Sequence, residues 1–310
     1  MLDTGEPRDF RGYGDKLPKV KWPDNARVAV SFVVNVEEGG ELSLSAGDER
    51  NENTYEAPLN EEVTGTPDLC MESHYEYGTR VGYWRIMNLL EQFGISATMS
   101  CCGRALETSP WLAKDIVKRG HEISAHSYRW EPHAHMNEDQ ERKIIKKCVQ
   151  AIRSTSGIRP TGWHTKSQTS VNTRRLLVEE GGFLYDSNAY NDDLPYIARI
   201  AGQQHVVLPY AFDTNDMRFE PGSGFVFAED FSRYCIDAFD QLWNEGANTP
   251  KMMSVGLHLR IIGRPARIGG LEKLLSHMKS KGAVWFARRD QIAQHWRPSH
   301  GLPLQPQQTV

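Results

Sequence analysis

The chain has few cysteines and no long apolar run. Its five cysteines are odd in number and form no CxxC pair or other metal-ligand spacing, which argues against a disulfide framework and a cysteine–zinc site. No apolar run approaches the roughly 20 residues that cross a bilayer as a helix. The first residues lack the basic and apolar regions of a secretory signal peptide. We therefore expect a cytoplasmic protein whose reduced cysteines pack as small apolar side chains.

A strong net charge is also lacking. The 36 lysines and arginines stand against 40 aspartates and glutamates, for a formal net charge of −4. This balance provides no basic field for nucleic acid and no cationic face for a membrane. A hydrophobic content of 39% and a charged content of 25% are typical of a globular protein with a sizeable core. We expect a small-molecule substrate, and no nucleic-acid or membrane partner.

Strand and helix patterns alternate along most of the chain. Residues 27–36 are β-branched and apolar, as in a buried strand, and a helix pattern at 83–93 precedes a strand pattern at 97–102. Such alternation is typical of a parallel sheet covered by helices. With seven or eight predicted strands, a barrel fits better than an open sheet, and one α/β barrel commonly occupies a chain of 310 residues.

Polar segments flank and interrupt this pattern. We predict an N-terminal extension at 1–25, a barrel domain at 26–297 and a flexible tail rich in proline and glutamine at 298–310. Residues 40–70 are polar and resemble a long loop inserted after the first strand. Loops of that length inside compact domains are usually functional.

Conspicuous polar side chains stand where predicted strands end. The first strand ends at Glu37 and Glu38, a second strand ends at His126, and the strand at 252–257 is followed by His258. The active face of a (β/α) barrel lies at the carboxyl ends of its strands. One glutamate there suits a general base toward water, and the other suits orienting that water or binding a metal. His258 suits protonation of a departing nitrogen, because the histidine pKa lies near neutrality. The alternative is solvated acids in a turn and histidines in structural ion pairs.

A wider set of residues is predicted to bind the substrate or to support these groups. Arginines after the last of these strands suit an anionic substrate group, and acids that follow another short strand suit holding an arginine or orienting an imidazole. The alternative for each is ordinary packing. The predicted set is Glu72, Arg159, Trp163, Asp186, Asp193, Arg260 and Arg264.

Six further segments are distinctive. They are NVEEGGE at 35–41, MES at 71–73, YEYG at 75–78, EEGGFLYDS at 179–187, DTNDMRF at 213–219 and IGRP at 262–265. The order of these motifs resembles the polysaccharide deacetylase superfamily, also called the NodB-homology or carbohydrate esterase 4 group, and within it the branch of cofactor-sparing allantoinases and cyclic imide hydrolases. The resemblance covers almost the whole chain and implies a single-domain, distorted (β/α)7-type barrel that hydrolyses an amide-like C–N bond.

The resemblance also implies roles for individual residues. In the sugar deacetylases the first motif carries two aspartates, the catalytic base and a metal ligand, and Glu37 and Glu38 stand at those positions. The second motif supplies two histidines, four residues apart, to zinc; His126 matches the first, but Trp130 stands at the second. Of the remaining motifs, the third matches Arg159-Pro160, the fourth matches Asp186 and Asp192-Asp193, and the fifth, which carries the catalytic histidine, matches His258.

Trp130 is the departure with the largest consequence. A catalytic zinc usually has three protein ligands and a water, and here only Glu38 and His126 match. The expected cofactor is therefore either none or one divalent metal, zinc. Without a Lewis acid, an electrophilic or strained cyclic ureide or imide is favoured over an unstrained acetamide.

The sequence thus predicts a hydrolase of a non-peptide C–N bond that opens an allantoin-, hydantoin- or imide-like ring by acid–base attack of water. The alternative is a metal-dependent N-deacetylase of amino sugars, such as chitooligosaccharide or peptidoglycan fragments, with His133 or His135 as the missing ligand. A third, less favoured hypothesis is a catalytically silent barrel that serves as a binding subunit. The resemblance and the polar insertion together predict a homodimer or homotetramer.

Overall fold

A computed structural model describes residues 8–54, 61–222 and 224–304 of the chain. Its strands are β1 (Val28–Val36), β2 (Thr98–Cys101), β3 (Glu122–Ala125), β4 (Gly162–Trp163), β5 (Tyr185–Asp186), β6 (Tyr196–Ile200), β7 (Gln203–Val207), β8 (Lys251–His258) and β9 (Val284–Phe286). They join one curled sheet in the order β6-β7-β5-β4-β3-β2-β1-β8, and β9 pairs with β1 as well. The pairing of β6 with β7 is antiparallel, and the other strand pairings are parallel.

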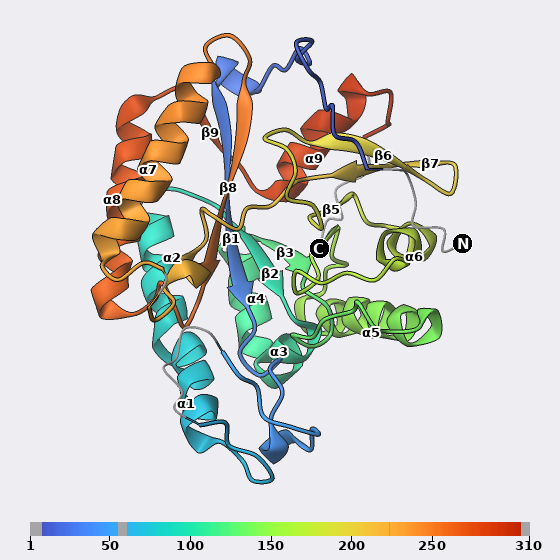
Figure 1. Ribbon diagram of the computed structural model, residues 1–310, viewed down its shortest axis with the longest axis vertical. Helices are drawn as coiled ribbons and strands as arrows, with labels where there is room; N and C mark the ends of the chain where they lie inside the picture. Colours follow the sequence, from blue (N-terminus) through green and yellow to red (C-terminus); the bar gives the residue numbers. More distant parts are fainter. Residues whose placement is uncertain (1–7, 55–60, 223, 305–310) are drawn as a thin grey trace.

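Helices surround this sheet (Figure 1). They are α1 (Leu69–Tyr77), α2 (Tyr83–Gln92), α3 (Gly103–Thr108), α4 (Pro110–Lys118), α5 (Glu138–Ser156), α6 (Thr173–Glu180), α7 (Ala228–Glu245), α8 (Pro265–Lys281) and α9 (Arg289–Ser299). Among them, α7 and α8 pack side by side against the β8 side of the sheet. The single α/β domain is a distorted, partly open barrel, which confirms the predicted fold class.

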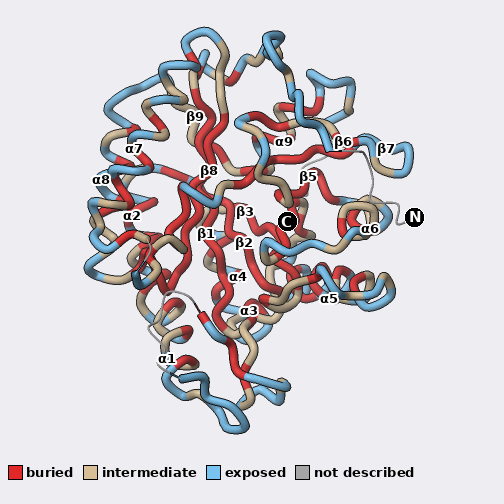
Figure 2. Tube along the Cα trace, viewed as in Figure 1, coloured by how far each residue is buried: buried red, intermediate tan, exposed pale blue. Residues whose placement is uncertain are grey.

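Strand β1 has two different faces because side chains alternate along a strand. Val30, Phe32 and Val34 pack into the apolar core beneath the helices, and burying each such side chain contributes about 1.5–3 kcal/mol. Ser31 and Asn35, on the opposite face, are also buried, and Asn35 donates to Tyr210 inside the barrel. Figure 2 shows β1 to β5 and β8 as the buried centre of the molecule. The same alternation places Glu37 on the inner side of the barrel.

The parallel register brings the strand ends to one edge. Asn35 in β1 lies opposite His258 in β8, and Val36 lies opposite Cys101 at the end of β2. Cys101 in turn pairs with Ala125 at the end of β3. Glu37 and His126, which follow β1 and β3, therefore emerge at the same edge as His258.

The sequence patterns missed two features of the fold. The antiparallel hairpin of β6 and β7 closes the sheet edge where strictly parallel strands were expected. The predicted loop at 40–70 ends in helix α1, which continues through a π-helical turn at Gly78–Gly82 into α2. Part of that loop, 55–60, lies outside the described residues.

The predicted domain boundaries stay a prediction. Residues 1–7 of the extension and 305–310 of the tail lie outside the described residues, and α9 continues into the predicted tail. No helix in the described part of the chain is long and apolar enough to cross a membrane.

Candidate active site

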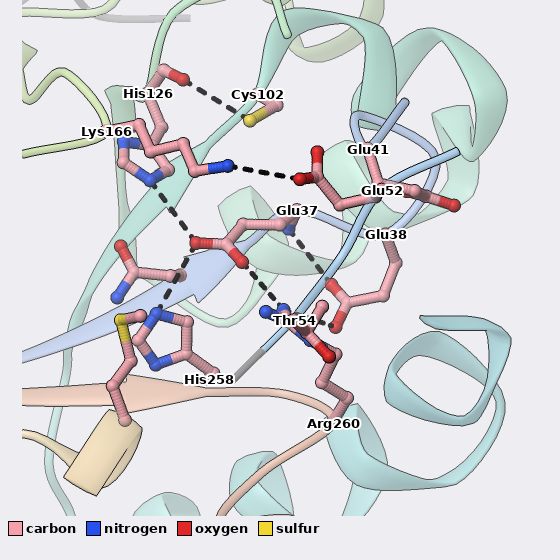
Figure 3. A network of polar contacts seen from close by, with 12 residues as sticks. Glu37, Glu38, Glu41, Glu52, Thr54, Cys102, His126, Lys166, His258 and Arg260 are labelled. Carbon is pink, nitrogen blue, oxygen red and sulfur yellow. Dashed lines mark hydrogen bonds and ion pairs between the residues drawn. The ribbon is translucent and has the colours of Figure 1, made fainter. Parts of the chain in front are cut away.

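Glu37 lies at the centre of a buried cluster at the carboxyl edge of the sheet (Figure 3). Its Oε2 accepts a hydrogen bond of 2.6 Å from Nη1 of Arg260. Its Oε1 lies 3.3 Å from Nε2 of His126 and 3.4 Å from Nε2 of His258. This Oε1 is buried and has no hydrogen-bond partner among the described residues. The structure thus brings together Glu37, His126, His258 and Arg260, all of which the sequence analysis had selected.

Asp216 orients His258 from behind. It begins a short 3-10 helix, Asp216–Arg218, and its Oδ1 lies 2.6 Å from Nδ1 of His258. Its Oδ2 accepts from the main-chain N–H groups of His258 and Ile262, at 2.7 and 3.1 Å. A carboxylate held by these donors fixes the imidazole with Nδ1–H toward Asp216 and Nε2 toward Glu37.

The two carboxylates also set the charge of His258. Burial disfavours the imidazolium, but the charges of Glu37 and Asp216 outweigh it and raise the pKa of His258 to about 10. His258 is therefore protonated at neutral pH and can act as an acid.

The neighbouring glutamates differ in their pKa. Burial raises the pKa of Glu37, but the opposing charges of Arg260 and His258 hold this pKa well below its usual range. For Glu38 burial dominates over the attraction of Arg260, and the pKa rises to about 7. Glu38 accepts from the main-chain N–H of Glu37 at 3.0 Å. Its Oε1 lies so close to the π-helical turn that a Cβ atom on Gly78 would collide with it, so a larger residue there would displace the Glu38 carboxylate.

His126 has a fixed orientation. Its Nδ1 lies 2.8 Å from the main-chain oxygen of His164 and must donate to it, since a carbonyl oxygen only accepts. The rings of His126 and His164 stack, with centroids 5.1 Å apart. In the neutral ring this leaves Nε2 as an acceptor that faces Oε1 of Glu37. The two atoms can then receive hydrogen bonds from the same water molecule.

Cations and aromatic rings form the wall beside Glu37. The guanidinium carbon of Arg260 lies 4.4 Å from the ring centre of Tyr75 and 5.3 Å from that of Trp130. Arg264 lies behind, where its Nε donates to the main-chain oxygen of Arg260 at 3.3 Å and its Nη2 contacts His74. Arg260 thus touches the predicted base directly, whereas Arg264 supports the segment that carries Arg260.

The side chains around Glu38 and His126 do not fit a divalent metal. No group of three or more His, Cys, Asp or Glu residues in the described ranges is placed to hold a metal ion. Trp130 is buried at the predicted position of the third ligand, and Nη1 of Arg260, 3.9 Å from Oε1 of Glu38, already brings a positive charge to the carboxylate pair. We therefore derive no chemical step through a metal at this site.

The proposed replacement ligands are wrong. His133 is fully buried elsewhere, with Nδ1 2.8 Å from Oε1 of Glu141 and Nε2 2.8 Å from Oγ of Ser127. Both of its ring nitrogens are therefore engaged. His135 is exposed in the loop before α5.

Arg159 and Trp163 do not reach the cluster. Arg159 precedes β4 and so lies at the opposite, amino edge of the sheet, where it donates to the main-chain oxygen of Gly181. Trp163 is fully buried on the helix-covered side of the sheet, where it packs against Phe183. Alternation along the strand instead turns the next residue, His164, toward the site. His164 fits the same strand-end pattern that selected His126 and His258.

Three predicted acids also lie apart from Glu37. Glu72 accepts from Ser43 at 2.5 Å and joins α1 to the inserted loop. Asp186 is fully buried and pairs with Arg174 and His205, at 2.8 and 3.1 Å. Asp193 lines a separate cavity of about 720 Å³ on the β8 side of the hairpin. None of these contacts involves the groups around Glu37.

Removal of the Asp186 carboxylate should therefore affect stability and not catalysis. Asp186→Ala removes the carboxylate that pairs with the buried His205 and with Arg174, which costs about 1–3 kcal/mol. We expect a lower urea midpoint with kcat within twofold of wild type. A large loss of kcat in a fully folded variant would return Asp186 to the active site.

Several site residues were missed by the sequence analysis. Asp216 lies within the DTNDMRF segment, but no spacing connects it with His258, because the contact depends on the loop before α7. Lys166 and Glu52 meet at the rim of the site at 3.4 Å, one from the loop after β4 and the other from the inserted loop. The prediction that the long insertion is functional carried the only signal for Glu52.

The chain is similar to known proteins over nearly its whole length. The family model described as polysaccharide deacetylase matches residues 65–181. A Schizosaccharomyces pombe protein provisionally named a polysaccharide deacetylase is 40% identical over 318 residues, which cover 95% of this chain and 98% of that protein.

Solved structures agree with this assignment. The crystal structure of PuuE allantoinase has a TM-score of 0.92 at 45% identity and covers 96% of this chain and 99% of its own. A Pseudomonas aeruginosa protein provisionally named a polysaccharide deacetylase has a TM-score of 0.91 at 44% identity, with coverage of 96% and 100%. The resemblance seen in the motifs is confirmed, and the chain belongs to the polysaccharide deacetylase family.

Proposed function

We propose that the protein opens a cyclic amide ring of the allantoin, hydantoin or imide type by acid–base attack of water. It is a hydrolase of carbon–nitrogen bonds other than peptide bonds, as are the deacetylases and the allantoinase to which it is similar. The observation that carries the proposal is the position of Glu37 Oε1 between the Nε2 atoms of His126 and His258. Trp130, at the position where the resemblance places a metal ligand, favours a substrate that needs no Lewis acid.

The geometry supports a balanced reaction sequence. Glu37 takes a proton from water, and the water oxygen bonds to the ring carbonyl carbon while the carbonyl electron pair moves to its oxygen. The tetrahedral species collapses, the ring C–N bond breaks, and the nitrogen takes the Nε2 proton of His258. Glu37, 3.4 Å away, then returns its proton to His258. The product is a ring-opened carboxylic acid, which releases its proton to solvent.

Arg260 and Asp216 hold the two reacting groups in their starting states. Arg260 keeps Glu37 ionised by its hydrogen bond, and Asp216 keeps His258 protonated. The same charges limit the basicity of Glu37, so the reaction depends on positioning the water between Glu37 and His126.

A substrate panel tests the proposed function. Purified protein is incubated with allantoin, hydantoin, succinimide and maleimide, and ring opening is followed by loss of the cyclic species. At least one ring should be opened with multiple turnovers. Failure with all four would reject the proposal.

The alternative function is N-deacetylation of amino sugars, and it is supported by similarity to proteins that are described as deacetylases. These include a Helicobacter pylori peptidoglycan deacetylase that is 27% identical over 242 residues. Acetate release from N-acetylglucosamine oligomers, dependent on added divalent metal, would favour this activity. The side chains around Glu38 and His126 argue against it.

The pH dependence should distinguish the two glutamates. With Glu37 as the base, whose pKa lies well below its usual range, the base is ionised throughout neutral pH, and His258 stays protonated until its pKa of about 10. We expect kcat/KM to be flat between about pH 5 and 9, because this ratio reports groups of the free enzyme. With Glu38 as the base, kcat/KM would rise with pH through about 7. The profile is measured on a ring substrate and corrected for ionisation of the ring N–H.

We also propose self-association into a dimer or tetramer. The support is the resemblance to allantoinases and the polar insertion at 40–70, which a bare barrel does not need. Size-exclusion chromatography with light scattering at micromolar concentration should give two or four times the chain mass of 35.2 kDa. A monomer would remove the proposal.

A further inference from the structure

Lys166 has a fixed place at the rim of the cluster. It follows β4 in a tight turn, where Ser167 has a positive φ of 47° and the main-chain N–H of Thr165 donates to Asn188 at 2.8 Å. His164, two residues earlier, stacks on His126. The turn therefore directs the lysine side chain toward the same edge of the sheet as the catalytic groups.

The Lys166 ammonium is held between a ring and a carboxylate. It lies 3.3 Å from the ring centre of Trp130 and 3.4 Å from Oε1 of Glu52. Its side chain is 23% exposed and that of Glu52 is 3% exposed. Figure 3 shows the Lys166 side chain extending past the His126 ring toward Glu52. Ordering a long, flexible lysine side chain costs conformational entropy, which the contacts with Trp130 and Glu52 must offset.

The side chains of Lys166 and Arg260 both contact the ring of Trp130, but their other contacts differ. Arg260 is fully buried, and its Nη1 donates to the base at 2.6 Å. The Lys166 ammonium has three N–H groups, and its ion pair with Glu52 is long for a hydrogen bond. Burial lowers the pKa of Lys166, against the charges of Glu52 and Glu37, so Glu37 and this ammonium lie within each other's field.

The reaction proposed above needs a donor for the carbonyl oxygen. That oxygen gains a full negative charge when water adds, and a preorganised donor there is usually a large catalytic contribution. The main-chain N–H groups of Glu37, His164 and His258 already donate to Glu38, Ala125 and Asp216. They are therefore not available for the oxyanion.

We infer that Lys166 is the residue that binds the carbonyl oxygen of the substrate and stabilises the oxyanion, with Trp130 and Glu52 holding its ammonium in place. The inference rests on the proposed ring-opening function and adds a catalytic residue to it. The ammonium donates a hydrogen bond to the oxygen as the carbonyl electron pair moves there, and it keeps its proton when the C–N bond breaks. The Lys166 ammonium, held next to Trp130, thus supplies the positive charge that stabilises the negative substrate oxygen.

The main test compares Lys166→Met with wild type on the ring that wild type opens fastest. Methionine keeps much of the apolar stem of the side chain and removes the charge next to Trp130. We expect kcat to fall about 10²–10³-fold, the usual effect of removing one oxyanion donor, with KM within about threefold because the interaction strengthens only in the transition state. Lys146→Met, in an exposed part of α5, is the matched control and should retain wild-type kcat. Circular dichroism checks that both variants are folded.

Glu52→Gln separates catalysis from a structural ion pair. It removes the Lys166–Glu52 pair but leaves the ammonium, so we expect kcat to fall less than tenfold. Equal losses in Glu52→Gln and Lys166→Met would show that the pair only holds the inserted loop, and would overturn the inference.

Chemical rescue provides a readout that does not depend on loop stability. In a Cys70→Ser background the other four cysteines are buried, so bromoethylamine can modify Lys166→Cys and rebuild an ammonium of nearly the lysine length. We expect kcat to recover at least tenfold. Wild-type kcat in Lys166→Met, or no recovery on rescue, would reject the role of Lys166 but would leave the proposed ring-opening function standing. Absence of ring opening by wild type rejects the proposed function and the inference together.

Discussion

Glu37→Gln is expected to lower kcat for ring opening by about 10²–10⁴-fold, the usual contribution of a general base, while KM changes little. Glutamine keeps the shape of the side chain and the hydrogen bond from Arg260, but it cannot take a proton from water. The fall should appear in kcat and kcat/KM alike, because the lost interaction belongs to the chemical step.

A second buried glutamate provides the control for this variant. Glu141 is fully buried, like Glu37, and it accepts a hydrogen bond from His133 away from the site. Glu141→Gln should lower the thermal midpoint and leave kcat of the folded protein near wild type. Wild-type turnover in Glu37→Gln would show that the base is another group, and Glu38, whose pKa is about 7, would be the next candidate.

His258→Ala is expected to lower kcat by a comparable factor, about 10²–10⁴-fold. The variant lacks the imidazolium that protonates the leaving nitrogen. The loss should be smaller for succinimide and maleimide than for hydantoin, because an imide nitrogen leaves more easily as an anion and needs less protonation. Kinetics of the variant on both classes of ring measure this difference.

The chain offers a matched control for His258. His277 pairs with Asp240 at 2.8 Å between α7 and α8, as His258 pairs with Asp216, but at the surface. His277→Ala should keep kcat. An equal loss on imide and hydantoin rings in His258→Ala would mean that His258 positions Glu37 and does not protonate the leaving group.

The sequence was most informative where a side chain directly follows a buried strand. The apolar alternation in β1 places Glu37 inside the barrel edge, and parallel pairing then brings His126 and His258 to it, as the registers of β1 with β8 and of β2 with β3 show. The same reasoning failed for Trp163, which lies on the helix-covered side of the sheet. Arg159, which the family resemblance selected, precedes its strand and lies at the opposite edge.

Contacts made by loops were beyond the reach of the sequence patterns. Asp216 and His258 are 42 residues apart, and neither periodicity nor capping predicts how the loop between β7 and α7 folds back onto β8. Lys166 and Glu52 are 114 residues apart and meet only because the inserted loop closes over the end of β4. Such contacts depend on tertiary packing, which local sequence patterns do not predict.

The most direct test of acid–base ring opening by Glu37 and His258 is turnover measured on one protein preparation before and after exhaustive treatment with a chelator, with the metal content of the same sample determined. We expect ring opening at an unchanged kcat in a sample with far less than one metal ion per chain. Loss of ring opening on chelation and its return with stoichiometric metal, together with acetate release from N-acetylglucosamine oligomers, would contradict this account.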